Sequence, residues 1–141
     1  MELIYESGTV AESCGNCHTV TQCDVAETLR GGKRRWDLEC SCPACGSVWH
    51  AGGTGKAPER FRNAIISTNG KWTIRLDDPS SSGARLLQVL RGAHDCSISE
   101  AKQLAESLRT SGIQGTLVDV ESLSGKLLEA GIPASIKRLE E

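Results

Sequence analysis

Two pairs of cysteines, each separated by two residues, constrain the fold of this chain more than any other feature. The pairs are Cys14 with Cys17 and Cys42 with Cys45, and 24 residues lie between them. A C-x2-C pair forms a tight knuckle whose sulfurs converge on one ion, and two knuckles supply a tetrahedral set of four thiolates that suits zinc. Four thiolates leave no open position for water, so the spacing predicts one structural Zn²⁺ and no catalytic metal.

The other three cysteines do not fit a disulfide framework. The chain has seven cysteines, an odd number, and six lie in its first third. The N-terminal residues lack the charge-then-apolar order of an export signal, so we expect a cytoplasmic protein with reduced thiols. Cys40 competes with Cys42 as a ligand, but a C-x4-C pair is looser and Pro43 suits the tight turn. We therefore prefer Cys42, and we place Cys40 and Cys23 in strands.

Two histidines follow the knuckles closely. His18 comes directly after the first knuckle, and His50 lies five residues after Cys45. An imidazole at either place could donate a hydrogen bond to a zinc-bound thiolate. We prefer the simpler interpretation, in which both are solvated surface side chains.

The segment between the knuckles has the pattern of a hairpin. Residues 18–29 and 34–40 alternate as strands do, and Arg30-Gly31-Gly32-Lys33 between them is typical of a turn. A third short strand, residues 47–50, follows the second knuckle. The order of knuckle, hairpin, knuckle and strand resembles a zinc ribbon over residues 1–52. The resemblance implies a β domain with almost no apolar core, whose folding depends on the metal.

Residues 53–69 are expected to form a linker. The run from Ala51 to Pro58 is rich in chain-breaking residues, and residues 58–68 could form a short helix with Phe61, Ile65 and Ile66 on one side.

Residues 70–141 have the periodicity of a second domain, with the element order β-α-α-β-α-β. The fold class is therefore α+β. The order rests on an alternating strand at 72–76, a helix that Ser82 could cap and that ends near residue 92, and a helix opened by a Ser97–Glu100 capping box. A short strand at 115–119, a helix over 120–130 and a strand at 132–136 complete the order.

This second half resembles the C-terminal domain of the bacterial ribosomal stalk protein. The residues that carry the resemblance are the helix at 84–94 with its Arg91-Gly92 ending, the Glu100-Ala-Lys102 motif in the helix that follows, and Leu127-Leu-Glu-Ala-Gly131 before the last strand. In that family, basic side chains beside an apolar patch on the two consecutive helices recruit translation factors. The resemblance therefore implies a partner-binding face at Arg91 and Lys102, with Arg85 standing in the apolar patch.

No apolar stretch reaches the length of a membrane span, so we expect no membrane-embedded segment.

The charge balance opposes nucleic-acid binding. The formal net charge is −2. Lys33, Arg34 and Arg35 at the hairpin tip are candidate phosphate contacts, but residues 1–55 hold four basic against seven acidic side chains. Four zinc-bound thiolates would add further negative charge, so we expect nucleic acid not to be a partner.

No arrangement in the sequence predicts an enzyme. Cys96, beside His94 and Asp95, is the one suggestive cluster, and neighbours on a turn do not usually face one another. We expect a non-catalytic protein-binding module, specifically a bacterial immunity protein or antitoxin that neutralises a toxin enzyme with a basic cleft. The alternative is a translation- or transcription-associated protein that contacts elongation factors, the ribosome or nucleic acid.

Overall fold

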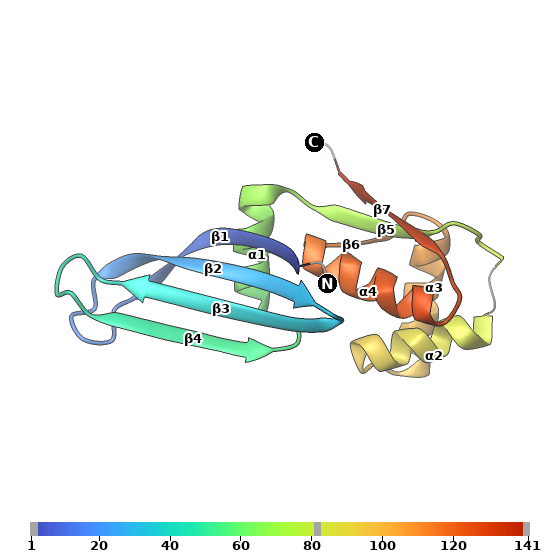
Figure 1. Cartoon of the computed structure of the whole chain (residues 1–141), viewed down its shortest axis with the longest axis horizontal. Coiled ribbons are helices and arrows are strands. Elements are labelled where there is room, and N and C mark those ends of the chain that lie inside the picture. Colours follow the sequence, from blue (N-terminus) through green and yellow to red (C-terminus); the bar gives the residue numbers. More distant parts are fainter. Residues whose placement is uncertain (1–2, 81–82, 140–141) are drawn as a thin grey trace. The chain divides into compact units, whose positions relative to one another are not determined.

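The chain divides into two compact units, residues 1–70 and residues 71–141. The computed structural model describes residues 3–80 and 83–139. Each unit has its own sheet (Figure 1). Each also has its own cluster of buried apolar side chains. The architecture is mixed α+β, as the sequence predicts.

The first unit is built on a four-stranded antiparallel meander. Its strands are β1 (Leu3–Ser13), β2 (Val20–Arg30), β3 (Lys33–Ser41) and β4 (Val48–Thr54), in the order β1-β2-β3-β4. The predicted hairpin is present as β2 and β3, and both residues of its tight turn, Gly31 and Gly32, have positive φ. The sequence analysis missed β1, which pairs with β2 along its whole length.

One face of this sheet is covered by α1 (Glu59–Asn69). Phe61 and Ile65 of the helix are buried against Val25 of β2 and Leu38 of β3. Residues 53–69 are therefore not a linker, because the helix belongs to the first unit. The expectation of almost no apolar core is also wrong, since the helix gives the sheet one.

The glycine-rich run after the second knuckle belongs to β4 and not to a linker. Gly52 and Gly53 lie opposite Asp37 and Trp36 of β3. A Cβ on Gly53 would lie 3.0 Å from the indole nitrogen of Trp36, and one on Gly52 would lie 2.9 Å from the Trp36 carbonyl oxygen. The two glycines therefore leave room for the indole ring and the carbonyl group of Trp36. They lie within β4 and do not end the strand.

The helix α1 is attached to β1 by close backbone packing and by polar contacts. A Cβ atom placed on Gly8 would lie 2.7 Å from the carbonyl oxygen of Ala64. Arg60 forms a two-pronged ion pair with Glu12, which lowers the pKa of that carboxyl group. The Asn69 side-chain amide donates a 2.7 Å hydrogen bond to the carbonyl of Ser7.

The second unit has the element order that the sequence predicts. It contains β5 (Trp72–Leu76), α2 (Gly83–His94), α3 (Ile98–Arg109), β6 (Ile113–Gly115), α4 (Leu117–Glu129) and β7 (Ala134–Arg138), with the antiparallel strand order β6-β5-β7. Helices α3 and α4 pack on the sheet, and α2 packs on both helices. The core includes Ile74, Leu86, Leu90, Leu108 and Leu127.

The ends of some elements differ from the prediction. Of the predicted strand at 115–119, only Gly115 lies in a strand, as the last residue of β6, because Thr116 caps α4 and forms a capping box with Asp119. The predicted box of Ser97 with Glu100 is confirmed at the start of α3. The predicted cap at Ser82 lies outside the described residues.

Replacing Gly8 with alanine should destabilise the contact between α1 and β1. The new methyl group would clash with backbone atoms of Ala64, which cannot move away as a flexible side chain can. We therefore expect the free energy of unfolding to fall by about 1–3 kcal/mol. Hydrogen-exchange mass spectrometry should show reduced protection in α1 and β1. Gly92→Ala, which places a methyl in open space on α2, is the matched control. Unchanged protection in Gly8→Ala would contradict the packing described here.

Candidate metal centre

The first cysteine knuckle is a closed turn between β1 and β2. The Cys14 N–H donates to the carbonyl of Thr19 at 2.9 Å, and the His18 N–H donates to the carbonyl of Cys14 at 2.9 Å. These bonds close the turn around the metal-binding side chains of Cys14 and Cys17. His18 has φ of 63°, a left-handed conformation that costs energy for any residue with a Cβ.

The second knuckle, between β3 and β4, repeats this geometry. Here the Cys42 N–H donates to the carbonyl of Ser47 at 2.8 Å, and the Gly46 N–H donates to the carbonyl of Cys42 at 2.9 Å. Gly46 has φ of 79° and occupies the position of His18 in the first knuckle. Glycine adopts this φ without the cost that His18 bears.

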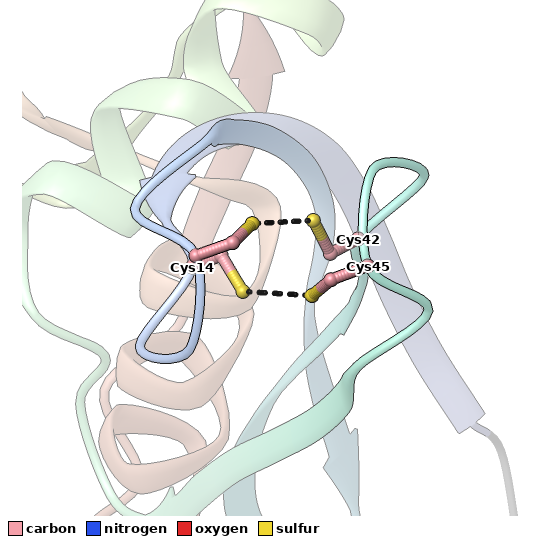
Figure 2. Close-up of side chains that lie close together, drawn as sticks. Cys14, Cys42 and Cys45 are labelled. Atoms are coloured by element: carbon pink, nitrogen blue, oxygen red, sulfur yellow. Dashed lines mark hydrogen bonds between the residues drawn. The ribbon is translucent and has the colours of Figure 1, made fainter.

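The four cysteine sulfurs of the knuckles form one cluster. All four Sγ atoms lie within 4.8 Å of one another, and the Cys14–Cys45 and Cys17–Cys42 pairs are each 3.6 Å apart (Figure 2). A tetrahedral ion with sulfur ligands at about 2.3 Å has edges of roughly 3.8 Å between its sulfurs. The predicted ligands therefore lie together, and their donor chemistry and spacing fit zinc.

Hydrogen bonding favours the thiolate form in the second knuckle. The Ser47 hydroxyl, 3.2 Å from the Cys45 sulfur, lowers the pKa of Cys45 to about 5, and the Asn16 side chain contributes. The pKa of Cys42 is also lowered, chiefly by the backbone N–H of Cys45, with a further contribution from the buried Thr21 hydroxyl. Metal binding requires thiolates, so these contacts prepare the ligands.

Cys17 shows the opposite effect. Contacts with Thr19 lower the pKa of Cys17, but they are outweighed by desolvation and by the neighbouring sulfurs of Cys42 and Cys45, so that its pKa is raised. A second negative charge beside existing thiolates is unfavourable. A divalent cation at the centre would remove that repulsion.

The remaining cysteines of the first unit are joined to each other. Cys23 of β2 and Cys40 of β3 are directly opposite in the sheet, with Cα atoms 4.5 Å apart, and they form a disulfide. The expectation that no disulfide would form is wrong at this pair, because the strand register brings the two side chains within bonding distance. Cys40 is consequently outside the cluster of candidate ligands, to which Cys42 belongs.

The two histidines lie away from the thiolates in different ways. His50 lies on β4 opposite Glu39, and its Nδ1 is 3.7 Å from the carboxylate. His18 is exposed and takes part in its knuckle through its backbone N–H. These positions agree with surface imidazoles.

The three cations at the hairpin tip do not converge on one surface. Arg34 points to the α1 face of the sheet, where it forms a 3.0 Å ion pair with the buried Glu27. Lys33 and Arg35 lie on the opposite face, and Arg35 pairs with Asp37 at 3.0 Å. Two of the three predicted phosphate contacts therefore have carboxylate partners within the unit.

In the second unit, Arg85, Arg91 and Lys102 are all exposed. Arg85 donates a 3.0 Å hydrogen bond to the carbonyl of Ala130 at the end of α4, and Arg91 donates one of 3.3 Å to the carbonyl of Cys96. Arg85 thus satisfies a carbonyl at the end of α4, and Arg91 satisfies one in the turn between α2 and α3, while both side chains face solvent. Cys96 is half-buried against the apolar core, and its thiol is directed at the carbonyl of Leu90.

Sequence reasoning missed the hydroxyl groups around the metal centre. Thr19 and Ser47 each lie two residues after the second cysteine of a knuckle, and each hydroxyl is 3.2 Å from that cysteine's sulfur. This repeated C-x2-C-x-[Thr/Ser] pattern was a signal available in the sequence. The contact of Thr21 with Cys42 depends on the fold and has no such signal.

No protein-family model matches this chain. Within the described ranges 3–80 and 83–139, none of the helices has both the length and the apolar character that crossing a bilayer requires.

Removing the metal with a chelator should loosen the two knuckles and leave the rest of the chain folded. The amides of Cys14, His18, Cys42 and Gly46 should lose at least about tenfold of their exchange protection, because the metal joins the turns that hold them. The amides that join β2 to β3 are supported by the apolar core, so they should keep their exchange protection. The amides of residues 71–139 should keep theirs as well, because they belong to the other unit. Hydrogen exchange followed by NMR reads each amide. Unchanged protection in both knuckles would argue against a metal.

Changing Ser47 to alanine should raise the pKa of Cys45. The hydroxyl holds this pKa near 5, so the thiolate is favoured above pH 5 and is lost as the pH falls through that value. Without the hydroxyl, we expect the alkylation midpoint of Cys45 in metal-free protein to rise by roughly one unit, a tenfold change in the protonation equilibrium. Thr19→Val, the equivalent change in the other knuckle, should leave that midpoint in place. An unmoved midpoint in Ser47→Ala would reject this role for the hydroxyl.

Proposed function

We propose that this chain is a non-catalytic, zinc-containing protein-binding module of the cytoplasm. The metal centre supports the first part of the proposal, because four cysteine donors complete a tetrahedral zinc and leave no position for a substrate. The zinc then serves to hold the ends of the strands in the first unit.

The binding surface that we propose is the sheet face opposite α1. A hollow of about 610 Å³ is open on this face and is lined by residues of all four strands, among them Tyr5, Asp24, Asp37, Glu39 and His50. Tyr5 is 56% exposed although it is aromatic. A large exposed aromatic beside a polar hollow is typical of a protein-interaction surface.

The charges on this face carry the proposal. Asp24 on β2 lies directly opposite Glu39 on β3. Asp37, two residues along β3, lies on the same face and is paired with Arg35. Like charges directly opposite each other in a sheet are destabilising by themselves. A basic side chain from a partner would relieve this repulsion, and an acidic surface would speed the approach of a basic protein.

The partner that suits such a surface best is an enzyme with a basic active cleft. We therefore propose that the chain is a bacterial immunity protein or antitoxin that covers the cleft of a toxin enzyme. This agrees with a formal net charge of −2 and with the ion pairing of the cations at the hairpin tip.

A second candidate function rests on the second unit. Its element order is the one implied by the resemblance to the ribosomal stalk domain, and Lys102 is exposed on α3. In this alternative, Arg91 and Lys102 contact an elongation factor or the ribosome.

Affinity capture with two matched variants distinguishes these functions. The first variant neutralises the open face (Asp24→Asn, Asp37→Asn and Glu39→Gln), and the second removes the helix cations (Arg91→Ala and Lys102→Ala). We expect one stoichiometric partner with a toxin-like enzymatic domain, whose association rate falls by about tenfold with the first variant and is unchanged with the second. Capture of elongation factors or ribosomes, lost only with the second variant, would favour the alternative.

A further inference from the structure

The Cys23–Cys40 disulfide lies at the end of the hairpin nearest the metal centre. Pairing of β2 with β3 begins at Arg30 and Lys33 beside the turn, and it ends at Cys23 and Cys40. Both cysteines are at least 98% buried and belong to the same apolar cluster as Phe61 of α1. The bond therefore closes the last rung before the two strands separate toward their knuckles.

Thr21 connects this rung to the metal centre. It is 1% exposed, its carbonyl lies 3.7 Å from the Cys23 sulfur, and its hydroxyl contacts the Cys42 thiolate. On the other strand, Cys40 precedes Cys42 by two residues. The disulfide and the metal centre thus join the same two segments of chain at neighbouring points.

We propose that the Cys23–Cys40 pair is a redox switch that sets the zinc affinity of the four-cysteine centre. With the disulfide formed, the two knuckles are held close together and bind zinc more tightly. With the pair reduced, the knuckles separate more readily and release the ion more easily. The inference rests on the proposed zinc site.

The size of the effect follows from the chain between the ligands. Cys17 and Cys42 are 25 positions apart, and the disulfide bypasses 17 of them, so that eight remain. The probability that the ends of a flexible segment meet falls with about the 3/2 power of its length. Shortening the segment from 25 positions to eight strengthens zinc binding by at most roughly fivefold, a limit that is reached only if the β2–β3 pairing opens in the reduced form.

The redox step is an ordinary thiol–disulfide exchange. A dithiol reductant attacks one sulfur as its thiolate, the Cys23–Cys40 bond breaks, and a second exchange releases the reductant as its own disulfide. Two electrons and two protons pass from the reductant to the protein, which then carries thiols at both positions. Because the pair is buried, the attacking thiolate reaches it only when the end of the hairpin opens.

The coupling acts in both directions. If the disulfide strengthens zinc binding, zinc must stabilise the disulfide against reduction by the same factor. The bound metal also holds the end of the hairpin closed, and this slows access of the reductant. Loss of zinc therefore favours reduction of Cys23 and Cys40, and reduction favours loss of zinc.

The test compares the zinc affinity of the full chain in its two redox states. Zinc-loaded protein is oxidised or reduced, freed of reagent by desalting under nitrogen, and checked for thiols at Cys23 and Cys40 by alkylation and mass spectrometry. Competition with a chromogenic chelator then gives the zinc affinity of each form. We expect zinc binding to be weaker in the reduced form, by at most about fivefold. Equal or tighter binding in the reduced form would overturn the proposal.

Two variants sharpen the comparison. Cys23→Ala combined with Cys40→Ala should bind zinc as the reduced wild type does and should not respond to oxidation. Cys96→Ala removes a cysteine from the other unit and should keep the same difference as the unmutated chain. If the double variant folds poorly, the comparison between the oxidised and reduced forms of the unmutated chain still tests the proposal.

The outcomes separate this inference from the zinc proposal. Zinc bound equally in both states overturns the switch alone, whereas no stoichiometric zinc in either state overturns both. In the reciprocal measurement, zinc-loaded protein and a variant with serine at all four ligand positions are equilibrated in thiol–disulfide buffers. The disulfide should persist to more reducing buffers in the zinc-loaded protein, by the same factor as the difference in zinc affinity between the two redox states. Coincident midpoints would contradict the coupling.

Discussion

The antiparallel register of β2 and β3 determines where every cross-link of the first unit can form. One register brings Cys23 opposite Cys40, aligns the ends of both strands, and so places the knuckle before β2 beside the knuckle after β3. It also sends alternate residues to opposite faces, so that Val25 and Leu38 meet α1 while Asp24 and Glu39 face solvent. A slip of one residue would exchange the faces and separate the sulfurs. Metal ligation, disulfide formation and surface charge thus depend on a single pairing.

Two kinds of stabilisation act on this sheet. The Cys23–Cys40 disulfide joins β2 to β3 at the end nearest the knuckles, and the same rung packs in the apolar cluster under α1. Nearer the hairpin turn, Arg34 pairs with the buried Glu27. A small domain has little apolar surface to bury, and covalent or metal cross-links are a common remedy. Here the helix supplies the core that the four cysteines alone would lack.

What the sequence could predict was local. The metal ligands and the capping box of Ser97 with Glu100 depend on spacings of a few residues, and both were found. β1 was missed because Glu6 and Gly8 occupy its buried face, where an apolar alternation would be expected. The disulfide and the packing of α1 could not be derived, since they depend on pairing between distant segments. At 115–119, the apolar run containing Val118 was taken for a strand although Thr116 and Asp119 carried the signal for a helix start.

The position of Trp36 gives the first unit an optical reporter of its own integrity. Its ring centroid lies 5.4 Å from that of Phe61 on α1, and its indole nitrogen lies against the backbone of Gly53 on β4. One chromophore therefore senses the helix and an edge strand together. Indole emission depends on the polarity and packing around the ring, so departure of α1 would change its fluorescence without any attached dye. Loss of the contact between Trp36 and Phe61 can therefore be followed in real time by tryptophan fluorescence.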